Sequence, residues 1–318
     1  MGQQPERGGA RDASTVDLVA SGQFAISGQP QIGAVFPQTE LGGDPGAVRA
    51  WVQAVTELGY GHIAVFDHVV GADPEVHAGW DRPYTVETTF HEILVLFGFV
   101  AALTPLELVS SVVILPQRQT VLVAKQAAEI DLLTGGRFRL GVGIGWNAVE
   151  FEALGQRFGN RGARFEEQIE LMRRLWTEPS LSFEGRYEHV TGAGIRPLPV
   201  QRPIPVWIGA SVDVALARAG RLADGWFPQA QPGPALEHAI AVVHGAAAQA
   251  GRDPAAIGIE GRVQLAGVRA DGVADRVRAW REAGATHVGI STMGAGLATV
   301  EDHVAALRTA AEALALRR

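Results

Sequence analysis

Two adjacent residues, Asp67 and His68, are the strongest candidates for chemistry in this sequence of 318 residues. They directly follow an apolar segment, residues 62–66, that is typical of a buried strand. Imidazole suits acid–base work because it titrates near neutral pH, and the neighbouring carboxylate adds a charge at the same place. In the alternative interpretation, Asp67 only caps the loop after the strand and His68 takes no part in chemistry.

A glycine-rich run, GVGIG at residues 141–145, ends another apolar segment and precedes Trp146 and Asn147. Gly143 and Gly145 begin a G-x-G-x-x-A pattern, but that dinucleotide fingerprint belongs to the first strand–helix turn of a Rossmann domain. We interpret the run instead as a floor on which a flat ring can approach the backbone, with Trp146 as a wall. The alternative is a tight turn that needs positive φ angles.

Small residues also follow a later apolar segment, at Gly209, Ala210 and Ser211. Free backbone N–H groups at the start of a helix attract a negative group such as phosphate. Ordinary N-capping by Ser211 is the alternative, and a capped turn can still hold a phosphate. Earlier in the chain, Ser110, Ser111 and Val112 lie in an apolar run. Two adjacent serines in such a run indicate a bulge or a polar group that faces a barrel lumen.

Metal and hydrolase sites are poorly supported by the sequence. The chain contains no cysteine, which excludes disulfides, thiolate metal sites and cysteine nucleophiles. His91-Glu92 lacks the second histidine of an H-E-x-x-H zinc motif, because Val95 occupies its place. The sequence has no G-x-S-x-G motif and no P-loop lysine, so we predict no metal ligands and no hydrolase.

The elements that must position these residues alternate regularly between short apolar runs and amphipathic helical patterns. We expect strands at residues 32–36, 62–66, 106–114, 138–142, 205–208, 225–227, 257–263 and 287–290, with a helix after each. Eight such units predict an α/β fold, a (β/α)8 TIM barrel with the chemistry at the carboxyl ends of its strands. A Gly- and Pro-rich insertion, 178–203, separates the fourth helix from the fifth strand. We expect one domain over 31–318 after a disordered extension at 1–30.

Charge and hydropathy argue against nucleic-acid and membrane partners. The net charge of −7 argues against a nucleic-acid partner. The longest apolar run, residues 93–103, is shorter than the roughly 20 residues that a membrane span needs, and residues 1–30 lack the apolar core of a secretory signal. We therefore expect a cytoplasmic protein that acts on a small molecule, with no membrane partner.

The order of these motifs resembles the luciferase-like monooxygenase family. The segments that carry the resemblance are IGAVFPQ, FDHVV, LELVSSVVILPQR, AAEIDLLTGGRFRLGVGIGW, RGARFEE and PVWIGAS, and it extends over residues 31–316. The chain is most similar to the branch that depends on the deazaflavin coenzyme F420. The resemblance implies a (β/α)8 barrel with an insertion, assembled as a homodimer.

The resemblance also implies a role for each candidate residue. Asp67 corresponds to an aspartate that contacts the flavin or deazaflavin ring, and His68 to a histidine that acts as acid or base. Ser111-Val112 corresponds to a non-prolyl cis peptide that forms a bulge behind the ring. The remaining residues that it assigns to the coenzyme lie beside the ring (Gly143, Gly145, Trp146, Asn147) or in the phosphate-binding turn (Gly209, Ala210, Ser211).

Trp146 departs from the family pattern, because related sugar-phosphate dehydrogenases carry a glutamate there. We expect a more apolar substrate or a closed lid over the ring, with residues 69–91 and 178–203 excluding water. The predicted reaction is hydride transfer between coenzyme F420 and a small organic substrate. An FMN-dependent monooxygenase that uses molecular oxygen is the first alternative, and a flavin-binding barrel without turnover is the second. The Asp67-His68 pair favours the deazaflavin. The composition, with Lys125 as its single lysine, is typical of a GC-rich bacterial genome and favours the deazaflavin as well.

Overall fold

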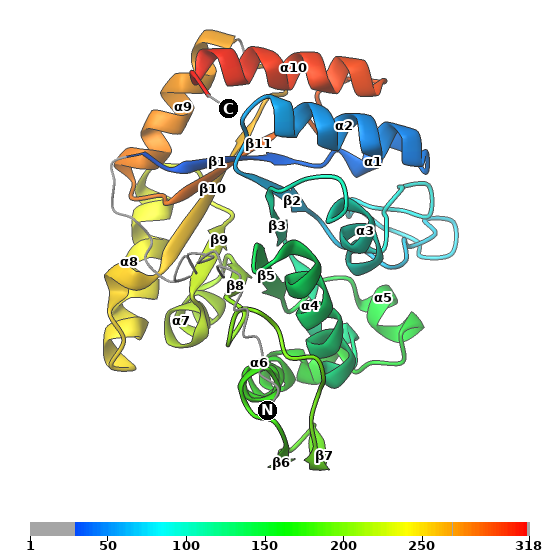
Figure 1. Ribbon diagram of the computed structural model, residues 1–318, viewed down its shortest axis with the longest axis vertical. Coiled ribbons are helices and arrows are strands. Elements are labelled where there is room, and N and C mark those ends of the chain that lie inside the picture. The colour runs from blue at the N-terminus through cyan, green and yellow to red at the C-terminus, as the bar shows by residue number, and fades with distance from the viewer. Residues whose placement is uncertain (1–28, 269, 317–318) are drawn as a thin grey trace, which may run out of the picture.

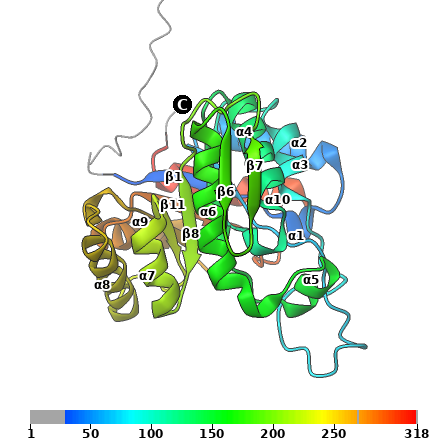
Figure 2. The ribbon, with the colours of Figure 1, turned by 90° about the horizontal axis from the view of Figure 1, so that it is seen from below.

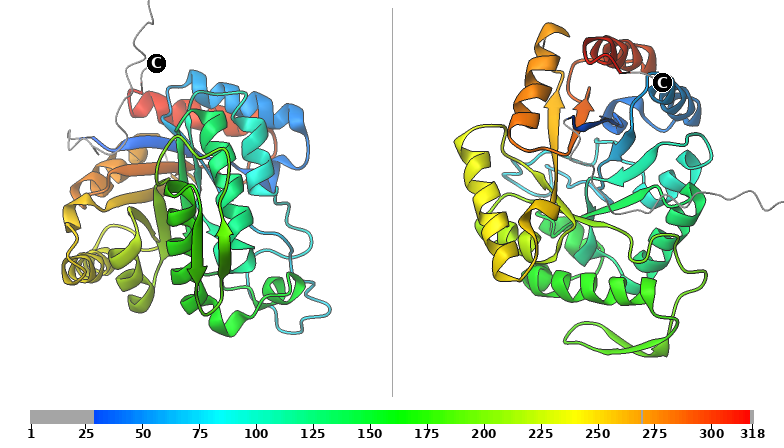
Figure 3. Two further views of the ribbon diagram at one scale, coloured as in Figure 1. Left: turned by 60° about the horizontal axis from the view of Figure 1, so that its bottom comes forward. Right: turned by 60° about the vertical axis from the view of Figure 1, so that its left-hand side comes forward.

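A computed structural model of the chain describes residues 29–268 and 270–316, and its strands close into a parallel barrel (Figures 1 and 3). The order around the barrel is β1, β2, β3, β5, β8, β9, β10 and β11, and β1 pairs with β11 to complete the ring. The short strand β4 continues the position of β3. The strands are β1 (Gln31–Val35), β2 (His62–Val65), β3 (Glu107–Ser110), β4 (Val113–Ile114), β5 (Phe138–Gly143), β8 (Val206–Ala210), β9 (Gly225–Pro228), β10 (Gly258–Gln264) and β11 (His287–Ser291). The predicted TIM barrel is confirmed.

Helices cover the outside of the barrel (Figure 3). They are α1 (Gln38–Leu41), α2 (Pro45–Glu57), α3 (Ile93–Val100), α4 (Thr120–Thr134), α5 (Ala148–Ala153), α6 (Arg161–Thr177), α7 (Asp213–Leu222), α8 (Pro234–Gln249), α9 (Ala270–Glu282) and α10 (Val300–Ala313). Helix α2 illustrates how the sequence sets their limits. The Asp44 side chain accepts a hydrogen bond from the Gly46 N–H, Pro45 occupies the first helical position, and Gly59 follows the last turn with φ 81°.

The predicted third strand, 106–114, is interrupted. The peptide bond between Ser111 and Val112 is cis, as the resemblance implies, and it separates β3 from β4. The Ser111 N–H donates to the Val65 carbonyl oxygen at 2.7 Å, and the Ser110 hydroxyl donates to the Gly141 carbonyl oxygen at 2.9 Å. These two bonds hold the residues before the cis bond, one to β2 and the other to β5.

The insertion at 178–203 contains a hairpin. Strands β6 (Leu181–Glu184) and β7 (His189–Ala193) pair antiparallel and lie beside α6, away from the barrel strands (Figures 1 and 2). Three short 3-10 helices complete the described elements: η1 (Leu115–Gln117), η2 (Phe158–Asn160) and η3 (Pro254–Ala256). All barrel strands belong to one sheet. The expected single domain stays a prediction, and the expected extension falls outside the described residues except for 29 and 30.

Two details of the helices differ from expectation. Helix α5 was not predicted; it begins after Asn147, whose side-chain oxygen accepts hydrogen bonds from the N–H groups of Val149 and Glu150. Capping of α7 by Ser211 is wrong, since that helix begins after Val212 and has no side-chain cap. No helix within the described ranges is both long and apolar enough to cross a membrane. The expected homodimer and cytoplasmic location stay predictions.

Candidate functional site

A small cavity opens where the barrel strands end. It has a volume of about 60 Å³, and its lining comes from several strands and the segments that follow them: Val35, Ala64, Phe66, Ser111, Val112, Gly209, Phe227, Pro228, Gln229, Glu260, Gly261, Arg262 and Gly289. Three of the predicted coenzyme residues, Ser111, Val112 and Gly209, are therefore brought together at the barrel mouth. In (β/α)8 barrels this end carries the chemistry.

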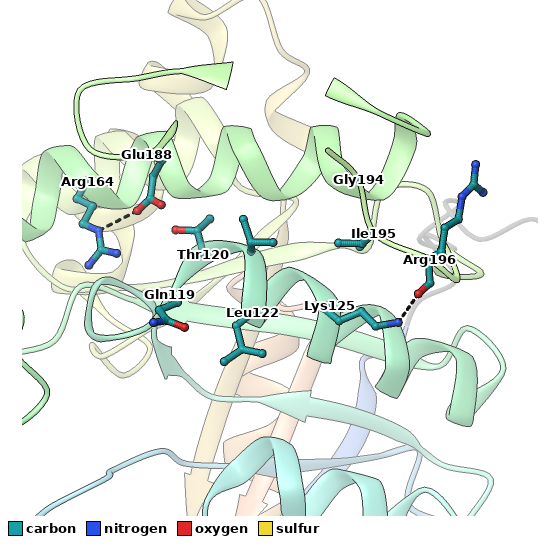
Figure 4. A pocket seen from close by; sticks show the side chains of 10 residues that line it. Gln119, Thr120, Leu122, Lys125, Arg164, Glu188, Gly194, Ile195 and Arg196 are labelled. Carbon is teal, nitrogen blue, oxygen red and sulfur yellow. Dashed lines mark hydrogen bonds and ion pairs between the residues drawn. The ribbon is translucent and has the colours of Figure 1, made fainter. Parts of the chain in front are cut away.

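A larger groove of about 640 Å³ lies elsewhere, between the start of α4 and residues 194–196 of the insertion (Figure 4). Three of its charged side chains, Lys125, Arg164 and Glu188, already have partners in the chain. Lys125 Nζ donates to the Arg196 carbonyl oxygen at 2.6 Å, and Arg164 Nε donates to Glu188 Oε1 at 2.9 Å. We place the site at the mouth because the cis bulge and the strand ends meet there.

Val112 explains two of the glycines. A Cβ atom on Gly143 would lie 2.7 Å from Val112 Cγ2, and one on Gly209 would lie 3.2 Å from Val112 Cγ1. A Cβ atom on Gly145 would lie 2.5 Å from Ile114 Cγ2, and Gly145 has φ 75°. Glycines at 143 and 145 thus make room for side chains of this chain, and the tight-turn alternative holds at Gly145. The expected glycine floor for a flat ring is not what their missing side chains provide.

Asp67 is buried and does not line the cavity. Its carboxylate accepts two bonds from Arg118 Nη2, at 2.8 and 3.0 Å, and one from the Ile114 N–H at 3.2 Å. Arg118 also donates to Glu92 at 2.7 Å. Burial raises the pKa of Asp67, while the charge of Arg118 acts in the opposite direction. Asp67 therefore connects the end of β2 to the segment that leaves the bulge.

His68 faces a second buried carboxylate, which the sequence analysis missed. Its Nδ1 lies 3.4 Å from Glu150 Oε2, an ion-pair distance outside hydrogen-bond geometry. Glu150 also accepts the Val69 N–H at 2.5 Å and Gln117 Nε2 at 2.9 Å. Burial alone would raise the pKa of Glu150, but His68, Val69 and Gln117 together lower it. The available signal was an acidic residue in the first turn of a helix capped by Asn147.

Aromatic rings enclose the other sides of His68. Its ring centroid lies 4.6 Å from that of Tyr84, 4.9 Å from Phe90 and 5.7 Å from Trp146, and Trp80 packs 6.0 Å from Trp146. We call Trp80, Tyr84, Phe90 and Trp146 the aromatic cover. Most of it comes from the loop 69–91, and the expectation that Trp146 forms a wall beside a coenzyme ring stays a prediction. Tyr84 has φ 72°, a conformation that non-glycine residues adopt rarely and often at functional sites.

The predicted phosphate turn remains open on one side. Gly209 lines the cavity, Ala210 is buried and Ser211 is exposed at the start of α7. In the first turn of this helix, Asp213 pairs with His238 at 3.0 Å. Asn147 contributes a further polar atom, because its buried Nδ2 has no acceptor among the described residues.

Charged side chains fill the lower lumen, beneath the cavity. Glu260 accepts from His62 Nε2 at 3.0 Å and from Arg139 Nη1 at 2.9 Å, and Arg139 Nε donates to Glu107 at 2.8 Å. Burial, followed by the charge of Arg139, lowers the pKa of His287 to about 2. The histidine stays neutral, and the carboxylates compensate Arg139. In the described part of the chain, no three potential metal ligands gather in one place.

The comparisons with known proteins agree with this geometry. The family described as luciferase-like monooxygenase matches residues 24–303. An uncharacterised protein of Mycobacterium tuberculosis is 35% identical over 195 residues, which is 61% of this chain and 66% of the relative. An F420-dependent glucose-6-phosphate dehydrogenase of Gordonia bronchialis is 32% identical over 222 residues, 67% of this chain and 62% of the relative. These alignments span slightly less than two thirds of each relative.

Solved structures share the fold at low sequence identity. An F420-dependent secondary alcohol dehydrogenase in complex with an F420–acetone adduct has a TM-score of 0.74 at 16% identity, covering 91% of this chain and all of that one. The FMN complex of the oxygenating constituent of a Pseudomonas putida type II Baeyer–Villiger monooxygenase has a TM-score of 0.58 at 16% identity, covering 74% and 67%. Both comparisons support the barrel architecture.

Proposed function

Because the chain belongs to the luciferase-like monooxygenase family, we propose that it is an oxidoreductase that transfers a hydride between coenzyme F420 and a small organic substrate. The observation that carries the proposal is the cavity at the barrel mouth, which Ser111, Val112 and Gly209 line together. The similarity to an F420-dependent dehydrogenase over two thirds of this chain favours the deazaflavin.

The lining fits a tricyclic coenzyme in its chemistry, but only in part in its volume. Val112 offers an apolar surface and Gly209 a turn without a side chain. Asn147 lies outside the lining, and its buried amide nitrogen has no acceptor among the described residues. The cavity of about 60 Å³ equals only about two water molecules, each of which occupies ~30 Å³. The coenzyme therefore needs more room than this cavity offers, and in our proposal the aromatic cover beside His68 moves when the coenzyme binds, as lids commonly do.

The chain supplies positioning and proton handling around the coenzyme. When bound, coenzyme F420 supplies the carbon that gives or takes the hydride. Glu150 lies at ion-pair distance from Nδ1 of His68 and favours a proton on that nitrogen, which leaves Nε2 to hold or release a proton. Asp67 and Arg118 keep the segment after the bulge in place. The aromatic cover excludes water once it closes.

FMN-dependent monooxygenation with molecular oxygen is the second candidate. The description of the matching family favours it, and so does the fold shared with an FMN-bound monooxygenase. Both candidates use the same barrel mouth and the same His68–Glu150 pair, so the geometry alone favours neither of them.

Titration of the purified protein with each coenzyme tests the proposal. We expect coenzyme F420 to bind with a change in its absorbance spectrum, and FMN to bind at least tenfold more weakly. Tight binding of reduced FMN together with oxygen consumption would favour the monooxygenase. Binding without turnover over a broad panel of alcohols, aldehydes and ketones would indicate a carrier rather than an enzyme. If neither coenzyme binds, the proposal is wrong.

A further inference from the structure

Arg262 is a largely buried cation at the barrel mouth. It lies on β10 two residues after Glu260, so both side chains point into the lumen. Its guanidinium carbon lies 5.3 Å from the centroid of the Phe66 ring, and it lines the mouth cavity beside Ser111 and Gln229. Arg262 therefore presents a positive charge to the space where we place the ligands.

The other two arginines of this region are paired, and Arg262 is not. Arg118 binds the carboxylates of Asp67 and Glu92, and Arg139 binds those of Glu107 and Glu260. Over residues 29–268 and 270–316, the side chain of Arg262 has neither an ion pair nor a hydrogen bond, only the contact with Phe66. Buried charges in proteins are normally paired, so an uncompensated one at a cavity indicates a site for a charged ligand.

The pKa shifts of the three arginines differ in direction, in agreement with the difference in their pairing. Burial lowers the pKa of Arg262, although Tyr84 and Glu260 act in the opposite direction. The carboxylates beside Arg118 and Arg139 instead raise the pKa values of those two arginines. Glu260 attracts Arg262 electrostatically, but its two oxygen atoms bind His62 and Arg139, and neither an ion pair nor a hydrogen bond joins it to Arg262 among the described residues.

We propose that Arg262 binds a carboxylate or phosphate group of a small ligand in the mouth cavity. The volume of about 60 Å³ holds a group of that size but no ring system. A guanidinium with free N–H groups matches such oxygen pairs in a bidentate geometry. The inference rests on the proposed function, because the anionic group belongs either to the substrate or to the coenzyme.

Binding of acetate to the coenzyme-free protein tests the proposal, with acetamide as the neutral probe of the same shape and inorganic phosphate as the second anion. We expect acetate or phosphate to bind to the wild type and acetamide to bind at least tenfold more weakly. Arg262→Gln should weaken binding of the anion at least tenfold, and Arg262→Lys should weaken it less. Arg49→Gln is the matched control, because Arg49 also stacks on a phenyl ring, that of Phe99, on the exposed surface of α2.

A second titration, with coenzyme F420 and with FMN, separates the two sources of the anion. If the substrate carries it, Arg262→Gln leaves coenzyme affinity unchanged and acetate binds together with the coenzyme. If the coenzyme carries it, Arg262→Gln weakens coenzyme binding at least tenfold and acetate competes with the coenzyme. Thermal melting establishes that each variant folds, and Arg262→Lys serves should Arg262→Gln fail to fold.

Two results would overturn the proposal. One is anion and coenzyme binding that the Arg262 variants leave unchanged. The other is a wild type that binds neither acetate nor phosphate and whose coenzyme affinity does not depend on residue 262. A wild type that binds acetate through Arg262 but neither coenzyme would contradict the proposed function and leave the anion site standing.

Discussion

Nδ1 of His68 lies 3.4 Å from Oε2 of Glu150, and the two residues come from different strand–helix units of the barrel. The carboxylate is held in turn by the Val69 N–H and by Gln117 Nε2. The imidazole therefore takes its orientation from α5 and from the start of the loop 69–91. A histidine fixed at one ring nitrogen presents the other in a defined tautomer, which acid–base catalysis requires.

Replacing Glu150 by Gln should lower turnover roughly tenfold to a hundredfold, as an order of magnitude for part of a general acid–base contribution. The amide cannot stabilise a protonated imidazole, and the tautomer of His68 is no longer fixed. Nitrogen chemical shifts of the His68 ring would report the tautomer directly. Glu152→Gln, on the exposed side of the same helix, should change neither turnover nor these shifts.

A double-mutant cycle distinguishes a positioning residue from a merely structural one. If Glu150 acts through His68, adding Glu150→Gln to a His68→Ala protein should change turnover by less than about twofold. Equal losses in both backgrounds would contradict this role, since the effect of Glu150 would then not pass through the imidazole.

Replacing His68 by Ala should lower turnover by roughly 10²–10⁴, the usual contribution of general acid–base catalysis. Affinity for the coenzyme should stay within a few-fold of the wild type, because His68 does not line the mouth cavity. Single-turnover rates and spectroscopic titration measure the two quantities separately. His189→Ala, on the exposed hairpin, is the control. Unchanged turnover in His68→Ala would remove His68 from the reaction.

The sequence predicted the barrel well because its evidence is local. Apolar runs of strand length, Asp44-Pro45 and Gly59 locate elements without any knowledge of distant contacts. The cis bond at Ser111-Val112 came from the resemblance, since two adjacent serines indicate a bulge but do not specify a cis bond. The structure places that bond at the mouth cavity.

The errors concern contacts between segments distant in the sequence. Glu150 lies 82 positions after His68, and no periodicity links the two (150 − 68 = 82). Likewise, the sequence did not show that Arg118 donates to both oxygen atoms of Asp67, and the expected contact of Asp67 with the coenzyme ring stays a prediction. The space beside Gly143 belongs to Val112, which only the fold brings there. Ion pairs between distant residues, and the side chain that occupies the space beside a glycine, depend on three-dimensional packing.

Replacing Asp67 by Ala should lower the free energy of unfolding by roughly 3 kcal/mol, because Arg118 loses one of its two carboxylates in a largely buried place. The backbone at Ile114 also loses its acceptor, so the segment after the bulge is released. Coenzyme affinity should therefore fall together with stability. Urea unfolding and a coenzyme titration measure both, with Asp81→Ala on the exposed loop as the control. Full stability in Asp67→Ala would show that the bonds of Asp67 to Arg118 and to the Ile114 N–H do not stabilise the fold.

Because His287 is buried and neutral in the lower lumen, we predict that acid destabilises the fold, beginning near neutral pH. The pKa of His287 is lowered to about 2, so in the unfolded chain, where histidine titrates near pH ~6.5, this residue binds a proton that the folded chain excludes. Stability from His287 is therefore complete above pH ~6.5 and is lost as the pH falls below it, by about 1.4 kcal/mol per pH unit. Burial lowers the pKa of His303 and acts in the same direction, whereas the lowered pKa of Glu260 acts only below pH ~4.5.

Urea unfolding between pH 5 and 7 should show this slope, and His287→Asn should reduce it by about one proton even where it destabilises the fold at every pH. The exposed variant His189→Asn should keep the wild-type slope, and a slope that His287→Asn leaves untouched would show that another group carries the acid sensitivity.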